Sequence, residues 1–478
     1  MTTWPCGAAC LVVSLWLYCS VLVSVTAAQM QPAKLADGAF NVDLVTGPIV
    51  GPNRVVGLSG AYTALGYGIE NATITPAAYA TRTLWETRWF TWDATADLSP
   101  GPLRRIDFIN DGQGDTKSSD FLFVTVGAGA VMGDVGVGAI VRSQYYRIGD
   151  NTDVSLILAN YGLCYAFLQG QLLVGVAGRT AVLTLSKDGI GTLGSFSRSG
   201  PEAGAILGPA DRQYRIGVTA RSPLHANNEQ STTTSDLGLT APRAVVLPAE
   251  IQLGFAYQFG NRPLNRRWMN PHNRERELRN EMLLRRLQRQ RAQVRREQPL
   301  AELSTKTWAA QSDWLREPQD PEFRRAEGER IAHEEQELQR AIATAERRYD
   351  SAIAALSRRY ILVSLDLVFV GATDQGIGLE AFLNQERVVS GQRPSLAFRV
   401  GAEGEPIPNQ LRVRLGSYLE PARFAGVHPR LHATVGGDLK LFSFDIFGLV
   451  NPFELRLTAS LDIAESYRSV GISVGLWH

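Results

Sequence analysis

The stretch Phe453-Glu-Leu-Arg-Leu-Thr-Ala-Ser-Leu-Asp-Ile463 carries an apolar residue at every odd position and a polar residue at every even one. Successive side chains of a β-strand point to opposite faces, so this segment has one apolar face and one polar face. The chain closes on a second alternating stretch, residues 469–478. Similar segments recur along the sequence at about 9–11 residues, the length a tilted strand needs to cross a bilayer. The pattern predicts an all-β transmembrane barrel of the bacterial outer-membrane type.

The alternating segments predict about fourteen antiparallel strands, an even number as such barrels require. Met132-Gly133-Asp134 between two of them is a tight-turn signal for a hairpin. Before the terminal pair, the expected strands are Phe121–Val131, Val135–Tyr146, Val154–Phe167, Leu172–Leu185, Glu202–Leu207, Gln213–Ala220, Ile251–Phe259, Ile361–Val370, Ile377–Val388, Leu396–Val400, Leu411–Leu419 and Leu431–Phe442.

The composition agrees with a barrel and excludes other classes. After residue 28 no segment reaches the roughly 18 consecutive apolar residues of a spanning helix. The 45 glycines include many inside strand-like runs, where they permit close approach of another backbone. The formal net charge of +1 implies no whole-chain attraction to nucleic acid.

Residues 1–28 have the pattern of a cleaved secretory signal peptide. Leu11–Val25 is apolar, and Thr26-Ala27-Ala28 forms a small-residue cleavage site. The first five residues carry no Lys or Arg, so a retained anchor is the alternative. Cleavage removes three of the four cysteines and leaves Cys164 alone, without a disulfide or a cysteine-based metal site.

Residues 261–359 interrupt the strand pattern with a charged helical insertion. Pro299 is expected to end a basic helix spanning His272–Gln298, which carries a thin stripe of Leu283, Leu287 and Val294. A second helix is expected to start between Pro318 and Pro321. Its apolar residues follow a coiled-coil-like heptad seam interrupted only at Glu335, namely Ile331, Leu338, Ile342, Ala345, Tyr349, Ala352 and Leu356. The two helices predict an antiparallel hairpin; the alternative is a single solvated helix held by i,i+4 Glu–Arg pairs.

The side of the membrane that holds this insertion is not decided by the sequence. Counting strands back from a periplasmic C-terminus places the insertion outside the cell. The short turns after Val131, Phe167 and Leu207 would then lie outside as well. Barrels of this type keep short turns on the periplasmic side, so the two arguments disagree and at least one expected strand is miscounted.

The segment Gly57-Leu-Ser-Gly60-Ala61-Tyr62-Thr63-Ala64, followed by Thr75-Pro76-Ala77-Ala78, resembles the N-terminal signature of the FadL/TodX family of outer-membrane transport proteins. That signature reads Gly-x-Gly-Gly-Ala-Phe-Thr-Ala and then Asn-Pro-Ala-Gly. This chain departs from it at Ser59, Tyr62, Thr75 and Ala78. The resemblance is close over about 25 residues, and the helical insertion is not part of the family pattern.

The resemblance implies a small hatch folded inside a fourteen-stranded barrel and passive transport of small hydrophobic compounds of fatty-acid or aromatic type. The hatch and ligand residues it implies are Gly57, Gly60, Ala61, Tyr62, Thr63, Thr75 and Pro76. The last strand resembles the signal read by the barrel-assembly machinery, through Gly471, Val474, Leu476 and Trp477. That signal ends on an aromatic residue, whereas here His478 follows. Val470, Ile472, Val474 and Leu476 are expected to face lipid.

No catalytic constellation is recognisable, so no enzyme, cofactor or metal is expected. His428 and His432 lie about 13 Å apart in an extended strand, too far to share a metal. Charged residues of the second half, such as Asp366, Arg412, Arg414, Arg456 and Asp462, are interpreted as a polar barrel interior. The expected partners are outer-membrane lipid, the barrel-assembly machinery, a small hydrophobic ligand and a protein bound at the insertion.

The sequence therefore divides into a signal peptide (1–28), an N-terminal hatch (29–100), a first part of the barrel (101–260), the helical insertion (261–359) and a second part of the barrel (360–478). The expected function is transport of small hydrophobic compounds across the bacterial outer membrane. The alternative is an outer-membrane anchor that uses the insertion as a docking arm for an envelope or secretion partner. A purely structural tether through the basic helix is a third hypothesis.

Overall fold

The structure is a computed structural model. It describes residues 33–101, 107–111, 118–148, 152–189, 191–210, 212–227, 240, 242–303, 321–446 and 450–477. The expected signal peptide lies outside these residues.

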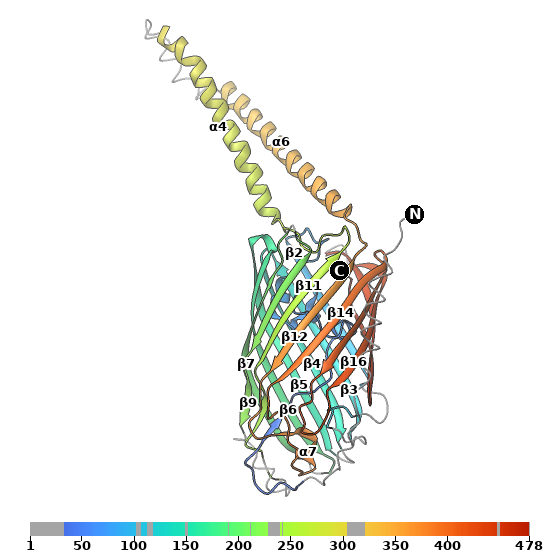
Figure 1. Ribbon diagram of the computed structural model, residues 1–478. Helices are drawn as coiled ribbons and strands as arrows, with labels where there is room; N and C mark the ends of the chain where they lie inside the picture. Colours follow the sequence, from blue (N-terminus) through green and yellow to red (C-terminus); the bar gives the residue numbers. More distant parts are fainter. Residues whose placement is uncertain are drawn as a thin grey trace.

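Fourteen antiparallel strands close into one barrel, which confirms the expected fold class (Figure 1). Each strand pairs with the next barrel strand in the sequence, and β18 closes the ring on β2. The barrel strands are β2 Phe90–Ser99, β3 Ser118–Met132, β4 Val135–Ile148, β5 Thr152–Phe167, β6 Leu172–Lys187, β7 Gly191–Leu207, β8 Tyr214–Arg221, β11 Glu250–Phe259, β12 Ile361–Val370, β14 Ser395–Ile407, β15 Leu411–Glu420, β16 Arg430–Ile446, β17 Val450–Ala464 and β18 Tyr467–Leu476.

The alternation of the sequence becomes an inside and an outside of this wall. On β12, Ile361 and Leu365 point outward and are 53% and 49% exposed, whereas Asp366 points inward and is 2% exposed. On β17, Leu457 and Ile463 are exposed on the outer surface, while the polar residues between them are buried. The outer surface is thus an apolar band suited to lipid and the lumen is polar, as in transmembrane barrels.

Two of the expected strands need correction, although the total is right. Residues 377–388 are not a barrel strand: they hold the short β13 (Gly376–Gly378) and the helix α7 (Leu379–Leu383). The missing strand is β2, which lies inside the segment assigned to the hatch (29–100). Strand β7 is also longer than expected, because its first half, rich in Gly and Ser, shows no apolar alternation.

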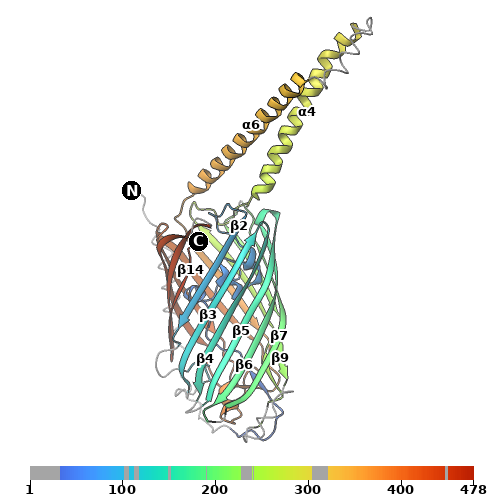
Figure 2. The same ribbon diagram turned by 180° about the vertical axis from the view of Figure 1, so that it is seen from behind.

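The corrected order removes the conflict over sidedness. The helical insertion, the short turns 133–134, 168–171 and 208–213, and the end of β18 all lie on one rim, here called the arm rim. The opposite rim, here called the loop rim, carries the long connections 100–117, 222–249 and 371–394. Figures 1 and 2 show the C-terminus beside the base of the helices, and Figure 1 shows α7 at the far end of the barrel. Counting residues 377–388 as a barrel strand had added one strand between the insertion and the C-terminus, which placed the two on opposite rims.

The insertion forms two helices, α4 (Pro271–Leu303) and α6 (Pro321–Ala354), which leave and return to the same rim (Figure 2). Pro321 begins α6 within the expected range, but α4 continues past Pro299 to Leu303. Proline removes one backbone hydrogen bond and kinks a helix without always ending it. None of the described helices is long and apolar enough to cross a membrane. We call this pair of helices the arm.

The seam between the two helices is only partly the expected one. Leu338 and Ile342 are buried, but Ile331 is 50% exposed. On α4, Leu283 and Leu287 face solvent, and Leu278 and Met282 are the half-buried residues instead. Ala352 is exposed, and Ile353 is buried in its place. The seam's interruption at Glu335 has a role, because Glu335 lies 3.6 Å from Arg279 of α4. The Val294 side chain lies outside the described part of the structure.

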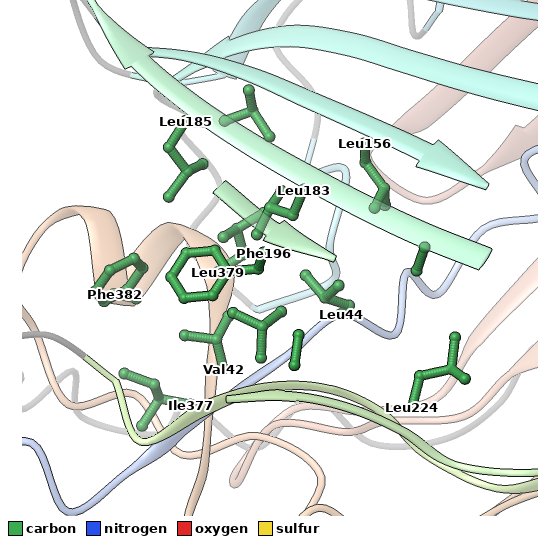
Figure 3. Close-up of a cluster of buried hydrophobic side chains, with 14 of the residues drawn as sticks. Val42, Leu44, Leu156, Leu183, Leu185, Phe196, Leu224, Ile377, Leu379 and Phe382 are labelled. Atoms are coloured by element: carbon green, nitrogen blue, oxygen red, sulfur yellow. The ribbon is translucent and has the colours of Figure 1, made fainter. Parts of the chain in front are cut away.

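The loop rim is closed by a small sheet and an apolar cluster. Strands β1 (Asn41–Asp43), β9 (Leu224–Asn227) and β10 (Ala244–Leu247) join β13 in one four-stranded sheet. Its side chains pack with α7 against inward-facing residues of β5, β6 and β7 (Figure 3). The labelled members are Val42, Leu44, Leu156, Leu183, Leu185, Phe196, Leu224, Ile377, Leu379 and Phe382.

Candidate functional site

Residues 53–80, here called the hatch, fill the middle of the lumen. They comprise the helix α2 (Asn53–Gly57) and the short 3₁₀ helices η1 (Ile69–Thr73) and η2 (Pro76–Ala80). Except for Tyr67 and Gly68, all of these residues are buried. The hatch rests on the wall from several sides, because α2 contacts β15 to β18 and η2 contacts β3 to β7. The lumen therefore holds an internal plug, as the sequence resemblance implied.

A ring of small wall residues makes room for the hatch. A Cβ added at Gly136 would lie 1.9 Å from Tyr79 O, and one at Gly217 would lie 2.1 Å from Thr63 O. Many members of the ring are direct cross-strand neighbours, such as Gly401 and Gly416. The ring comprises Gly136, Cys164, Gly175, Gly204, Gly217, Gly254, Ser364, Gly401, Gly416, Gly436, Ser460 and Gly471. The glycine-rich strands are thus explained by close approach of the hatch backbone.

The first hatch motif forms the tightest contacts with the wall. Gly57 abuts Gly436, and a Cβ on Gly57 would lie 2.8 Å from the Gly436 Cα atom. Gly60 has φ +68°, a conformation that favours glycine, and its carbonyl oxygen accepts a 3.4 Å hydrogen bond from Arg399. Ala61 and Tyr62 are fully buried in the hatch core.

Thr63 is anchored to the wall by the carboxylate of Asp366 on β12. It donates its backbone N–H and its hydroxyl to Asp366 Oδ2, at 2.9 and 2.7 Å. In the second motif, Thr75 Oγ1 accepts a hydrogen bond from Ala77 N and so caps η2, and Pro76 is its first residue. Pro76 also packs on Gly175, where a Cβ would lie 2.3 Å from its carbonyl oxygen.

A buried ionic network joins the hatch to strands of the second half. Arg54 lies 3.6 Å from Glu70 within the hatch and 4.0 Å from Asp438 of β16. Glu70 also pairs with Arg456, and Asp438 binds Arg414 at 2.6 Å. Arg414 and Arg456, two of the charges expected in the barrel interior, are therefore ion-paired, and the pair Arg456–Glu70 holds the hatch in place. Their role is structural, since burying a charge without a partner is costly.

A cavity of about 150 Å³ lies between the hatch and the apolar cluster of the loop rim. One side is apolar and includes Leu44, Val50, Leu156, Leu158 and Ile74. None of the seven hatch residues expected to bind ligand lines this cavity; the hatch contributes Val55, Thr73 and Ile74 instead. The seven residues pack within the hatch and against the wall, and their part in ligand passage stays a prediction.

The other side of the cavity is basic. Arg142, Arg179, Arg221 and Arg399 line it together with Glu250. Arg221 is paired with Glu202 at 3.0 Å and with Glu250. Arg179 is 5% exposed, and its Nη2 finds no hydrogen-bond partner among the described residues. The cavity therefore combines an apolar wall with guanidinium nitrogens that are free to donate. Sequence reasoning missed these arginines, because residues on different strands meet only through the barrel closure.

The terminal strand is partly as expected. Ile472 and Val474 face outward, and Gly471 faces the hatch, where a Cβ would lie 1.8 Å from Asn53 Oδ1. Leu476 and Trp477 do not face lipid: they are 8% and 7% exposed at the arm rim. Trp477 donates its indole N–H to Asn409 at 3.2 Å and lies under Arg412.

The histidines do not form a metal site in the described part of the chain. His432 is buried between Glu420 and Asp462, at 2.7 and 2.9 Å, and stacks on Tyr418. No group of His, Cys, Asp and Glu among the described residues could hold a metal ion.

The closed wall, apolar outer band and internal hatch define a hatch-containing transmembrane β-barrel of the outer-membrane type. No protein-family model and no curated protein matches the chain. Among solved structures it is similar to the CymD monoaromatic hydrocarbon channel, with 8% identity, 89% of this chain and 96% of that chain covered and a TM-score of 0.46. It is similar also to a Pseudomonas aeruginosa FadL homologue, with 11% identity, 92% of this chain and 98% of that chain covered and a TM-score of 0.43. A third similar structure is the Pseudomonas putida toluene transporter TodX, with 11% identity, 90% of this chain and 98% of that chain covered and a TM-score of 0.45. The family that the hatch sequence resembles is thus represented among similar structures.

Proposed function

We propose that this protein is a passive conduit for small hydrophobic compounds across the bacterial outer membrane. The observation that carries the proposal is the cavity between hatch and loop rim, whose apolar side shares Leu44 and Leu156 with the apolar cluster of the loop rim. A compound would enter through this cluster, rest in the cavity and pass on when the hatch moves. Sites of this kind are concave, largely apolar and carry few polar groups that fix orientation.

The basic side of the cavity favours compounds that carry an acidic head group. A guanidinium group binds carboxylates in a planar, charge-assisted geometry, and Arg179 has an N–H available for it. The apolar residues opposite would contact the hydrocarbon part. We infer that the preferred substrate is a small amphiphilic acid, of fatty-acid or aromatic type, rather than a neutral hydrocarbon.

Competition binding to the purified protein tests this proposal with dodecanoate and dodecanol as matched probes. We expect dodecanoate to bind more tightly, and Arg179→Gln to weaken it about ten- to a hundredfold, the equivalent of the 1.5–3 kcal/mol of a charged hydrogen bond. Arg147→Gln, at the loop rim with Asp153 as partner, is the control. Equal binding of both probes to wild-type protein would refute the acid preference, and no binding of either would refute the conduit.

The sidedness that we propose follows from the turns. Because barrels of this type keep short turns in the periplasm, the arm rim faces the periplasm and the loop rim faces the exterior. The C-terminus shares the arm rim with the turns 133–134, 168–171 and 208–213, whereas the long connections 100–117, 222–249 and 371–394 belong to the loop rim, which supports the same orientation.

A docking function of the arm is the second candidate, and the exposed leucines of α4 favour it. Leu283, Leu284 and Leu287 are 52%, 59% and 43% exposed on one stretch of the helix. Replacing residues 276–348 by a short flexible linker removes this surface while keeping the base of the arm. If the protein acts by docking, the linker variant should lose the function of the wild type in the cell envelope. If the protein is a conduit, the linker variant should take up hydrophobic compounds as the wild type does.

A further inference from the structure

The base of the arm lies directly on the hatch. Two segments form this base, residues 261–270 before α4 and residues 355–360 after α6, which we call the arm root. Leu264 and Tyr360 of the arm root are 1% and 7% exposed. They belong to the same buried apolar cluster as the hatch residues Val55, Tyr62 and Leu65. The insertion is therefore packed into the plug as well as joined to the barrel strands.

One wall arginine binds the hatch and the arm root at the same time. Arg215 of β8 donates to Leu65 O of the hatch at 2.7 Å and to Leu264 O of the arm root at 3.0 Å. Its Nε donates to Asn265 Oδ1 at 2.7 Å. The guanidinium group also lies 4.6 Å from the ring centre of Tyr67, whose hydroxyl donates to Leu264 O at 3.3 Å. All three elements share one buried polar junction.

The segment after the hatch is held by the arm root too. Residues 81–89, here called the strap, connect the hatch to β2. Arg82 of the strap lies 4.1 Å from the ring centre of Trp268, and Arg266 donates to Glu86 O at 2.9 Å. Burial lowers the pKa of Arg82 to about 10, so its charge persists at neutral pH and the cation–π contact is retained. The strap cannot shift without breaking these contacts.

The helices themselves touch the strap and the root. The guanidinium of Arg266 lies 5.6 Å from the ring centre of Tyr349 on α6, and the rings of Trp89 and His272 at the start of α4 are 5.7 Å apart. Arg358, after α6, lies 4.2 Å from the ring centre of Trp85. Aromatic and cationic side chains thus connect α4 with the strap and α6 with the arm root.

We propose that the arm root is a latch that keeps the hatch seated, and that displacement of the arm releases the hatch and opens the lumen. The arm then acts as a handle on the arm rim. This inference concerns hatch position and does not depend on which compound the barrel carries.

The chain contains its own reporter of hatch position. Cys164 is 0% exposed and lies under the hatch, with its Sγ 3.4 Å from Ala77 O. It is the single cysteine outside the first 28 residues. Because a seated hatch shields this thiol, its rate of alkylation by a water-soluble maleimide measures release of the hatch.

The test compares alkylation rates of folded, detergent-solubilised protein prepared without residues 1–28. We expect Arg215→Gln and Trp268→Ala to raise the rate at least tenfold, and Arg147→Gln, at the opposite rim, to leave it unchanged. Heat-modifiable migration shows that each variant is folded. Trp268→Ala keeps the test decisive if the strand variant fails to assemble, because Trp268 lies outside the barrel strands.

Replacing residues 276–348 by a short linker distinguishes the effect of the arm root from that of the helices. The root remains in this variant, so we expect the wild-type alkylation rate. Wild-type rates in both Arg215→Gln and Trp268→Ala, with the barrel folded, would overturn the latch. A fast rate in the linker variant would overturn its assignment to the root. If the alkylation rates support the latch but the protein binds no ligand, only the proposed function is contradicted.

Discussion

Gly57 of the hatch and Gly436 of β16 touch through their backbones, so closely that a Cβ on either would lie 2.8 Å from the Cα of the other. A contact of this closeness is available only to glycine. The neighbouring Gly437 points away from the lumen, and a Cβ there would make only an ordinary 3.5 Å contact with Arg412 O. Position 436 therefore requires glycine, whereas the adjacent position 437 can accept a Cβ atom.

This pair gives the first prediction. Gly436→Ala should push α2 out of its seat and raise the alkylation rate of Cys164 severalfold, whereas Gly437→Ala should not. Both variants should remain heat-modifiable, since the strand pairing of β16 is not altered. Equal rates in the two variants would show that the hatch tolerates displacement at this point.

Thr63 and Asp366 give the second prediction. Thr63→Val preserves the shape of the side chain but leaves a buried carboxylate with one donor fewer, at a cost of about 1–3 kcal/mol. We expect a lower midpoint of thermal unfolding and faster alkylation of Cys164. Thr180→Val is the matched control, because the Thr180 hydroxyl bonds Ser199 in an exposed position. A midpoint of Thr63→Val equal to that of the control would contradict the anchoring role.

The outer face of β12 gives a prediction that depends on depth. Leu365→Arg puts a charge on the lipid-facing side near the middle of the strand, where the cost is about 2–4 kcal/mol. Ile361→Arg puts the same charge on the same face at the arm rim, where the cost falls to about 0–1 kcal/mol. Equilibrium unfolding in lipid vesicles measures the difference. Equal losses would argue against a bilayer around this surface.

The position of the arm gives a further prediction. A protease site inserted near Gly328, which has open space around it, should be protected on intact cells and cleaved once the outer membrane is opened. Cleavage on intact cells would reverse the proposed sidedness. A protease site in residues 222–249 is the opposite control, since this connection belongs to the loop rim.

Alternation predicts a strand wherever one face meets lipid and the other meets polar groups, as in β5, β12 and β17. It misled at residues 377–383, where apolar residues at Ile377, Leu379 and Ala381 satisfy a period of two but pack as β13 and α7 in the loop-rim cluster. Strand β2 alternates in the same way, but it was not expected as a strand because it lies within the segment assigned to the hatch (29–100). Short apolar runs do not distinguish strand from buried helix by period alone.

The hatch motif located the plug, but the sequence could not reveal its seat. The ring of small residues and the cavity arginines come from strands far apart in the chain, such as Arg179 and Arg399. Their meeting depends on the closure and register of fourteen strands, where a one-residue shift turns a side chain to the other face. The arm root was likewise hidden, because its contacts with Tyr67 and Trp85 join segments about 200 residues or more apart.

Passage of small hydrophobic compounds through the cavity between the hatch and the loop rim can be blocked at Gly51. Gly51 lines this cavity, and a Cβ there meets no atom of the described residues within 4 Å, so Gly51→Trp should fill the space without moving the hatch. The measurement is uptake of dodecanoate by intact cells that produce either form. We predict that Gly51→Trp abolishes protein-dependent uptake while Cys164 alkylation stays at the wild-type rate. Unchanged uptake by the folded Gly51→Trp protein would show that the compounds do not pass through this cavity.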